Sequence, residues 1–218
     1  MRPYSVILIF LLTLTAVRAQ FSLNAGTGLM KGFGNSTYFY GLHIGGELPR
    51  SNELTMYARV GYYFPRNESD SVSTYLYAND LSTIPYQVLT NYVASLSHLT
   101  IEGGTRYYLG NGYDNGFSAY GGSCFMLMNS NVKRNYDSYD DSKYSLIEGE
   151  EPSGSILSIL LGIQGGLKYT ETALGTFYLD VTGAYSLYAL PSNVTAQNTN
   201  LYSPLIFNFS VGFRKDFY

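Results

Sequence analysis

His98 and Glu102 are the residues whose types and spacing come nearest to covalent chemistry. A serine, a histidine and an acid can acylate and deacylate a substrate when the hydroxyl group is hydrogen-bonded to the imidazole, and Ser97 precedes His98. In a strand, however, Ser97 and His98 point to opposite faces, and Glu102 lies about 13 Å from His98. No serine on another strand can be identified from the sequence as the nucleophile that would act with His98 and Glu102. We therefore expect no catalytic residue, and a lipid-modifying enzyme that uses His98 or His43 is the alternative.

Acidic side chains are concentrated in the segment 136–142, which reads Tyr-Asp-Ser-Tyr-Asp-Asp-Ser. Clustered oxygens suit calcium, but this segment lacks the glycine and the glutamate that the helix-loop-helix calcium loop requires. We expect a solvated acidic loop, with no metal and no cofactor. Tyrosine beside small polar residues is typical of adaptable recognition surfaces. The candidate surface-binding residues are therefore Tyr75, Tyr77, Tyr136, Tyr139, Asp140, Asp141 and Tyr144.

A second set of ionisable residues alternates with glycines along segments that have the period of β-strands. If these strands close around a narrow lumen, the charges point inward and must pair, because an unpaired buried ion is costly. Arg59 and Glu102 are expected at mid-depth on adjacent strands, and Asp180 lies between the strands that carry Lys168 and Arg214. We favour a network that fills and fastens the lumen over a gate or a proton path. The expected lumen network is Arg59, Glu102, Arg106, Lys168, Asp180 and Arg214.

Eight segments show the alternation of a strand with one apolar face. Short turns at 48–52, 110–116 and 170–176 are expected at one rim, and the long connections 65–95, 129–154 and 190–204 at the other. This pattern predicts an all-β, antiparallel, up-and-down transmembrane barrel. Residues 71–78 are expected to extend a strand, or residues 83–93 to form a short helix; a hairpin inserted in 65–95 would raise the count to ten. The predicted strands are 21–30, 37–47, 53–64, 96–109, 117–128, 155–169, 177–189 and 205–217.

Outward-facing aromatic residues fall into two groups along these strands. One group is expected near the rim with short turns and the other near the rim with long loops, with Leu, Ile, Val and Ala between them. Such an apolar band between two aromatic girdles is typical of a transmembrane barrel. The first group is Phe21, Tyr107, Phe117, Tyr169, Phe177, Phe213 and Phe217, and the second is Tyr38, Tyr40, Tyr62, Phe64, Phe125 and Phe207.

The first residues have the pattern of an export signal. An apolar run of about 13 residues, too short to span a bilayer as a helix, precedes the small-residue cleavage site Val17-Arg18-Ala19. We expect a signal peptide at 1–19 and one barrel domain at 20–218. Without Arg2 and Arg18 the chain carries 11 basic and 16 acidic residues, a balance that argues against nucleic acid as a partner. Cys124 is the single cysteine, so no internal disulfide forms.

The chain resembles the small eight-stranded outer membrane β-barrels, of the type of the outer membrane protein A transmembrane domain and outer membrane protein X. The resemblance rests on the leader, the alternating strands, the long loops and the closing residues Val-Gly-Phe-Arg-Lys-Asp-Phe-Tyr at 211–218. The closing segment is similar to the signal that the barrel-insertion machinery reads in that family. The absence of Trp and the Tyr- and Asn-rich loops resemble barrels of Bacteroidota more than those of enterobacteria.

The resemblance implies an integral protein of the Gram-negative outer membrane that contacts outer membrane lipid. We expect a filled lumen and a function at the surface loops, which would bind a protein, a glycan or a neighbouring envelope complex. Alternatives are a lipid A deacylase or acyltransferase and a small structural or weakly conducting barrel. Family members differ in function, so the fold does not choose among these readings.

Overall fold

The computed structural model describes residues 20–34, 37–68, 71–146 and 151–217. The expected signal peptide, 1–19, lies outside the described residues. Ten strands and one short helix are found within them. Their bounds are β1 Phe21–Gly32, β2 Tyr38–Pro49, β3 Leu54–Asn67, β4 Val72–Ala78, β5 Gln87–Gly110, β6 Gly116–Tyr136, β7 Tyr144–Leu146, β8 Ser153–Glu171, β9 Gly175–Pro191, α2 Val194–Gln197 and β10 Leu205–Phe217.

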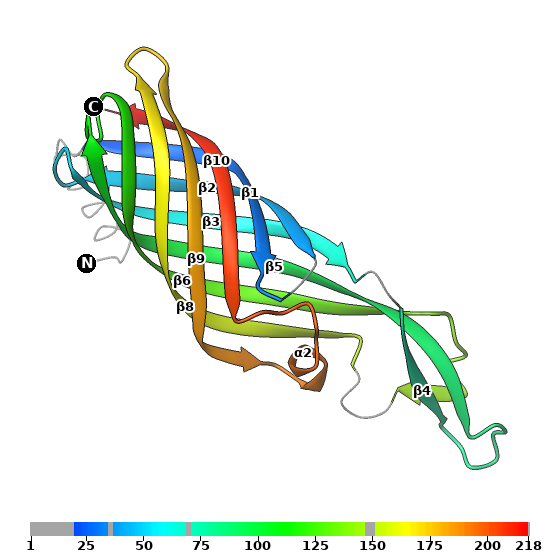
Figure 1. Ribbon diagram of the computed structural model, residues 1–218. Coiled ribbons are helices and arrows are strands. Elements are labelled where there is room, and N and C mark those ends of the chain that lie inside the picture. Colours follow the sequence, from blue (N-terminus) through cyan, green and yellow to red (C-terminus); the bar gives the residue numbers. More distant parts are fainter. Residues whose placement is uncertain (1–19, 35–36, 69–70, 147–150, 218) are drawn as a thin grey trace, which may run out of the picture.

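Eight of the strands close into an antiparallel barrel (Figure 1). Each strand of this ring pairs with its neighbour along the chain, and the ring closes where β1 pairs with β10, from Phe21 opposite Phe217 to Gly32 opposite Ile206. The β3–β5 pairing bridges the segment that contains β4. The predicted eight-stranded up-and-down barrel is therefore confirmed. β4 and β7 pair with the same sheet outside the ring, and β4 forms a hairpin with the outer end of β5, so ten strands describes the whole sheet but not the closed ring.

The two rims differ as the alternation of short and long connections predicts. Residues 50–53, 111–115 and 172–174 join strands at the rim where β1 begins and β10 ends. All three predicted short turns therefore lie at one rim. The connection after β9 contains α2, which Asn193 caps by accepting a hydrogen bond from the Ala196 amide. Among the described residues, no helix has the length and apolar character required to cross a membrane.

β5 and β6 continue well past the barrel rim, with 24 and 21 residues compared with 12 in β1. Their ends pair with each other as far as Tyr92 opposite Tyr136, β4 pairs with the end of β5, and β7 pairs with β4. We call this part, residues 71–95 and 133–146, the outer extension; Figure 1 shows it projecting away from the rim that carries the C-terminal end. Residues Val72–Ala78 do form a strand, as expected, but β4 is a separate strand paired with the end of β5; the helix at 83–93 is wrong because residues from Gln87 onward belong to β5.

The outer wall of the barrel is apolar. The residues of both expected aromatic groups are all exposed, and so are Leu42, Ile44, Val60, Ile101 and Ile163 between them. Large apolar side chains are stable on an outer surface of this kind when lipid covers them. The outward face of the strands therefore matches the lipid-facing band that the sequence predicts.

The lumen is packed by two layers of side chains. An apolar layer lies toward the long loops, and the layer toward the short turns is polar and charged. An eight-stranded barrel is just wide enough for its own side chains, so the two layers close the interior. We call the apolar layer the apolar plug, and it comprises Met30, Phe39, Tyr63, Ala94, Leu96, Met126, Met128, Val132, Leu160, Ala184, Leu201 and Ile206.

Glycines on the inward face allow these layers to form. A Cβ at Gly122 would lie 1.8 Å from the carbonyl oxygen of Thr105, and a Cβ at Gly166 would lie 2.5 Å from the ring of Tyr120. Larger residues at these two positions would collide with the neighbouring strand or with a lumen tyrosine. The large inward side chains occupy the space that the glycines leave.

Candidate functional site

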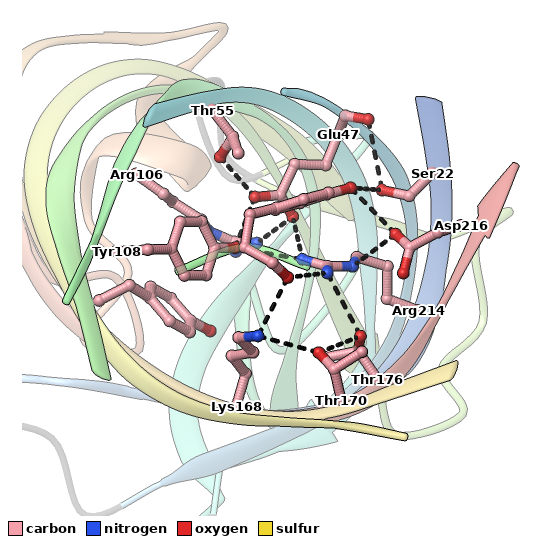
Figure 2. A network of polar contacts seen from close by, with 12 residues as sticks. Ser22, Glu47, Thr55, Arg106, Tyr108, Lys168, Thr170, Thr176, Arg214 and Asp216 are labelled. Carbon is pink, nitrogen blue, oxygen red and sulfur yellow. Dashed lines mark hydrogen bonds and ion pairs between the residues drawn. The ribbon is translucent and has the colours of Figure 1, made fainter. Parts of the chain in front are cut away.

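The six residues of the expected lumen network are all buried and come from β3, β5, β8, β9 and β10. Figure 2 shows several of them pointing into the barrel from opposite sides of the wall. Their contacts fall into a centre around Asp180, a second centre around Glu47, and a layer at the short-turn mouth. We describe these three parts in turn.

Asp180 is fully buried and contacts two guanidinium groups. Its Oδ2 lies 3.1 Å from Arg59 Nη1 and 3.0 Å from Arg106 Nη2, and the hydroxyl group of Tyr120 donates to its Oδ1. Arg59 also donates to Glu102 Oε2 at 2.8 Å, which is the adjacent-strand pair that the sequence places at mid-depth. Because β9 lies across the lumen from β3 and β5, Asp180 ties opposite walls together.

Glu47 is the second centre. Its Oε2 accepts from Arg106 Nη1 at 3.0 Å and lies 3.5 Å from Arg214 Nη1, while its Oε1 accepts from Thr55 at 2.5 Å and from Tyr108 at 2.6 Å. All of these side chains are buried. Both carboxylate oxygens of Glu47 are therefore occupied, as the high cost of an unpaired buried charge requires.

The turn between β5 and β6 closes the mouth at the short-turn rim. Tyr113, in this turn, is 2% exposed, and its hydroxyl group lies within hydrogen-bonding distance of Ser22 Oγ and Asp216 Oδ1, at 2.9 and 3.0 Å. Its carbonyl oxygen accepts from Lys168 Nζ and Arg214 Nη2, both at 3.0 Å. Burial raises the pKa of the Tyr113 phenol, so the hydroxyl group stays protonated as a donor.

The lumen network thus differs in one respect from the simplest reading of the strand order. Asp180 lies on the strand between Lys168 and Arg214, but it contacts Arg59 and Arg106 across the lumen instead. Lys168 binds backbone oxygens of the turn, and Arg214 contacts Glu47. Long side chains in a narrow barrel reach the opposite wall, and strand order does not report those contacts.

Six further residues join the network. Strand parity in the sequence places one of them, Glu47, on the inward face with the lumen cations, and sequence reasoning did not select the other five. Four of these five are tyrosines. Strand parity was the signal that could have found two of them, since Tyr57 shares the inward face of β3 with Arg59 and Tyr108 shares that of β5 with Arg106. The additional residues are Glu47, Tyr57, Tyr108, Tyr113, Tyr120 and Asp216.

The two histidines lie inside the lumen. His98 is 3% exposed, its Nδ1 is 2.8 Å from Ser130 Oγ, and its ring packs edge-on against Phe39. His43 Nε2 is 2.8 Å from the hydroxyl group of Tyr178. Ser130 is the serine on another strand that the sequence left unnamed. Because Ser130 is 0% exposed, a lipid ester could not reach it without displacing the apolar plug.

The candidate surface-binding residues all belong to the outer extension. The rings of Tyr77 and Tyr86 lie 6.1 Å apart, those of Tyr92 and Tyr136 lie 5.2 Å apart, and the hydroxyl group of Tyr144 donates to Pro85 O at 3.1 Å. These tyrosines hold the extension together. The remaining aromatic candidates, Tyr75 and Tyr139, are exposed at its surface.

The acidic part of the extension forms local contacts. Asp140 accepts from Ser142 Oγ at 2.5 Å and lies 3.1 Å from Lys143 Nζ, and these contacts hold its pKa below the usual range. Asp141 is exposed beside it. The Asp140 carboxylate is thus occupied by its own neighbours in a short turn.

Comparison with solved structures finds similarity to several bacterial proteins. Neisserial surface protein A, from Neisseria, matches with a TM-score of 0.50 and 14% identity over 91% of this chain and 96% of that chain. A major outer membrane protein from Thermus thermophilus matches at 0.48 and 15%, over 92% and 100% of the two chains. The Yersinia pestis attachment invasion locus protein Ail matches at 0.49 and 13%, over 91% and 100%. No family model and no curated protein matches the sequence.

At these identities the likeness to Neisserial surface protein A shows a shared fold. That fold is the small outer membrane β-barrel that the alternating strands predict, and the apolar outer wall accords with the expected location in the Gram-negative outer membrane.

Proposed function

We propose that the protein is an outer membrane barrel with a closed lumen that binds a partner protein through the outer extension. The observation that carries this proposal is the apolar tip of the extension, where Leu81 is 88% and Ile84 is 91% exposed. Outside the bilayer, contiguous exposed apolar surface commonly marks an interaction site.

Two further exposed apolar residues lie on one face of the β4–β5 hairpin. Tyr75 and Leu89 are directly opposite each other and are 53% and 57% exposed. Leu76, on the other face, is fully buried. The hairpin thus has one face with the buried Leu76 and one face open to solvent, where the Tyr75–Leu89 pair lies between the pairs Ser73–Asn91 and Tyr77–Gln87.

A partner that buries Leu81 or Ile84 would gain about 1.5–3 kcal/mol for each side chain. A lumen function finds less support, because the ion pairs and the apolar plug fill the barrel. The catalytic alternative requires substrate at His98 and Ser130, both of which are buried. The exposed residues of the outer extension are therefore the part of the molecule best placed for recognition.

The test is site-specific photo-crosslinking in intact cells, with the probe placed at Leu81 and, as a matched control, at Leu174. Leu174 is 62% exposed but lies in a short turn at the opposite rim. We expect a protein adduct at Leu81 that is absent at Leu174. The purified partner should then bind the Leu81→Asn variant at least about tenfold more weakly. Identical adducts from both positions, or unchanged affinity, would refute the proposal.

A further inference from the structure

A polar pocket of about 630 Å³ lies on the outer face of the barrel, at the base of the outer extension. Its volume falls in the roughly 300–1,000 Å³ range of small-molecule sites. Ser95 and Ser97 are buried in it, although their side chains share the outward face of β5 with Leu99. The lining comprises Tyr62, Pro65, Ser95, Ser97, Asn131, Val132, Lys133, Ser153, Gly154, Ser155 and Ser192.

The strand register places this pocket directly beyond the apolar band. Opposite residues in antiparallel strands share a face, so the outward side chains form rows across the wall. One row runs through Ile101, Leu127 and Ile159, and two residues further out a row runs through Leu99, Asn129, Leu157 and Leu190. The next rows are polar, with Ser97, Asn131 and Ser155 followed by Ser95, Lys133 and Ser153.

The outer face therefore changes from hydrocarbon-compatible to polar over about 7 Å along the strands. Leu99, Leu157 and Leu190 are exposed at the border of the pocket that faces the apolar band, and the exposed Tyr62 also lines the pocket. In a membrane barrel this is the depth at which the acyl chains of the outer leaflet end and the headgroups begin. A ligand in the pocket would contact hydroxyl groups, an amide and an ammonium group, with acyl chains resting on the leucines below.

Lys133 supplies the charge of the site. It is exposed, and among the described residues it has no carboxylate within 4.0 Å. Lysine is a common point-charge ligand for phosphate, and basic pockets at membrane depth bind lipid headgroups. Serine and asparagine side chains match the hydroxyl groups of a sugar because each can donate and accept hydrogen bonds.

We propose that this pocket binds the phosphorylated sugar headgroup of a lipid in the outer leaflet. The pocket shares no residue with the apolar tip of the extension, so this proposal does not depend on the proposed binding of a partner protein. Lys133 contacts the phosphate group, Ser95, Ser97 and Asn131 contact sugar hydroxyl groups, and the leucine row holds the first carbons of the acyl chains.

The test measures binding to the full barrel in detergent micelles, by native mass spectrometry and titration. The probes are a phosphorylated glucosamine-disaccharide lipid, the same lipid without phosphate, and water-soluble glucosamine phosphate. Lys133→Gln removes the charge, and Asn131→Phe fills the pocket from an outward position where an aromatic ring is compatible with a strand. Lys143→Gln is the matched control, because Lys143 is an exposed lysine on the same side of the barrel.

We expect Lys133→Gln to weaken lipid binding about tenfold, Asn131→Phe to abolish it, and Lys143→Gln to leave it unchanged. Removal of the phosphate should lower the affinity of the wild type to that of Lys133→Gln. Equal affinity for soluble glucosamine phosphate and the lipid would overturn the lipid assignment. Unchanged lipid binding by both pocket variants, each with the heat-sensitive gel mobility of a folded barrel, would overturn the site itself.

Discussion

Neutralising Asp180 is the sharpest test of the lumen network. Asp180→Asn keeps the shape of the side chain but removes the carboxylate that contacts both Arg59 and Arg106. Arg59 retains Glu102, and Arg106 retains Glu47, so each arginine loses one of its two ion pairs. The buried layer is left with an excess positive charge.

Removing one partner of a buried ion pair typically costs about 3–5 kcal/mol, because the remaining charge stays desolvated. We expect a loss of this size for Asp180→Asn, measured from urea unfolding of the barrel refolded in lipid vesicles. Arg106→Met should also destabilise the barrel, and the double variant should cost less than the sum of the two by about 0.5–3 kcal/mol. The coupling isolates the contact between the two side chains.

Asp140→Asn is the control for this experiment. Asp140 also accepts hydrogen bonds and pairs with a lysine, but it is exposed in the outer extension, where solvent screens the pair. Its unfolding midpoint should match that of the wild type. A loss below about 1 kcal/mol for Asp180→Asn, or strict additivity with Arg106→Met, would refute the view that the network fastens opposite walls.

Three further expectations follow from the packed interior. Gly122→Ala should lower the free energy of unfolding by about 1–3 kcal/mol, because its Cβ would meet Thr105 O, whereas Gly121→Ala, with 3.6 Å to the nearest atom, should have little effect; urea unfolding compares them. The wild-type barrel should show no stable large-pore current in planar bilayers, and such a current would contradict a filled lumen. His98→Ala should leave partner binding unchanged, and loss of a lipid deacylase or acyltransferase activity in this variant would instead favour the enzyme.

Alternation predicts the barrel strands well because lipid and lumen impose opposite demands on successive residues. In β10, Phe207 and Phe209 face outward while Asn208 and Ser210 are buried, and the segment was recognised on this basis. The same criterion ends β6 too early, at 128 instead of Tyr136, and begins β5 too late, at 96 instead of Gln87. Asn129 and Lys133 share the outward face of β6 with Phe125, so β6 stopped resembling a membrane strand where it leaves the membrane.

The inward face continues through that point. Met128, Ser130 and Val132 stay buried, and backbone pairing with β5 extends to Tyr136. The alternation of buried residues in β6 therefore continues beyond the point where the lipid-facing pattern ends. The contacts of Asp180 cannot be predicted from the lipid-facing or the inward-facing pattern, because they depend on how far arginine side chains reach across the lumen and not on strand register.

Barrel and extension meet through the apolar plug. Ala94 and Val132 at the junction belong to it, whereas none of the ion pairs described in the lumen includes a residue of the outer extension. Close-packed apolar side chains resist small displacements and carry no specific charge contact that a partner could exchange. Binding at the extension should therefore leave the ion pairs intact and the lumen closed, so that recognition takes place at the cell surface without a signal through the barrel.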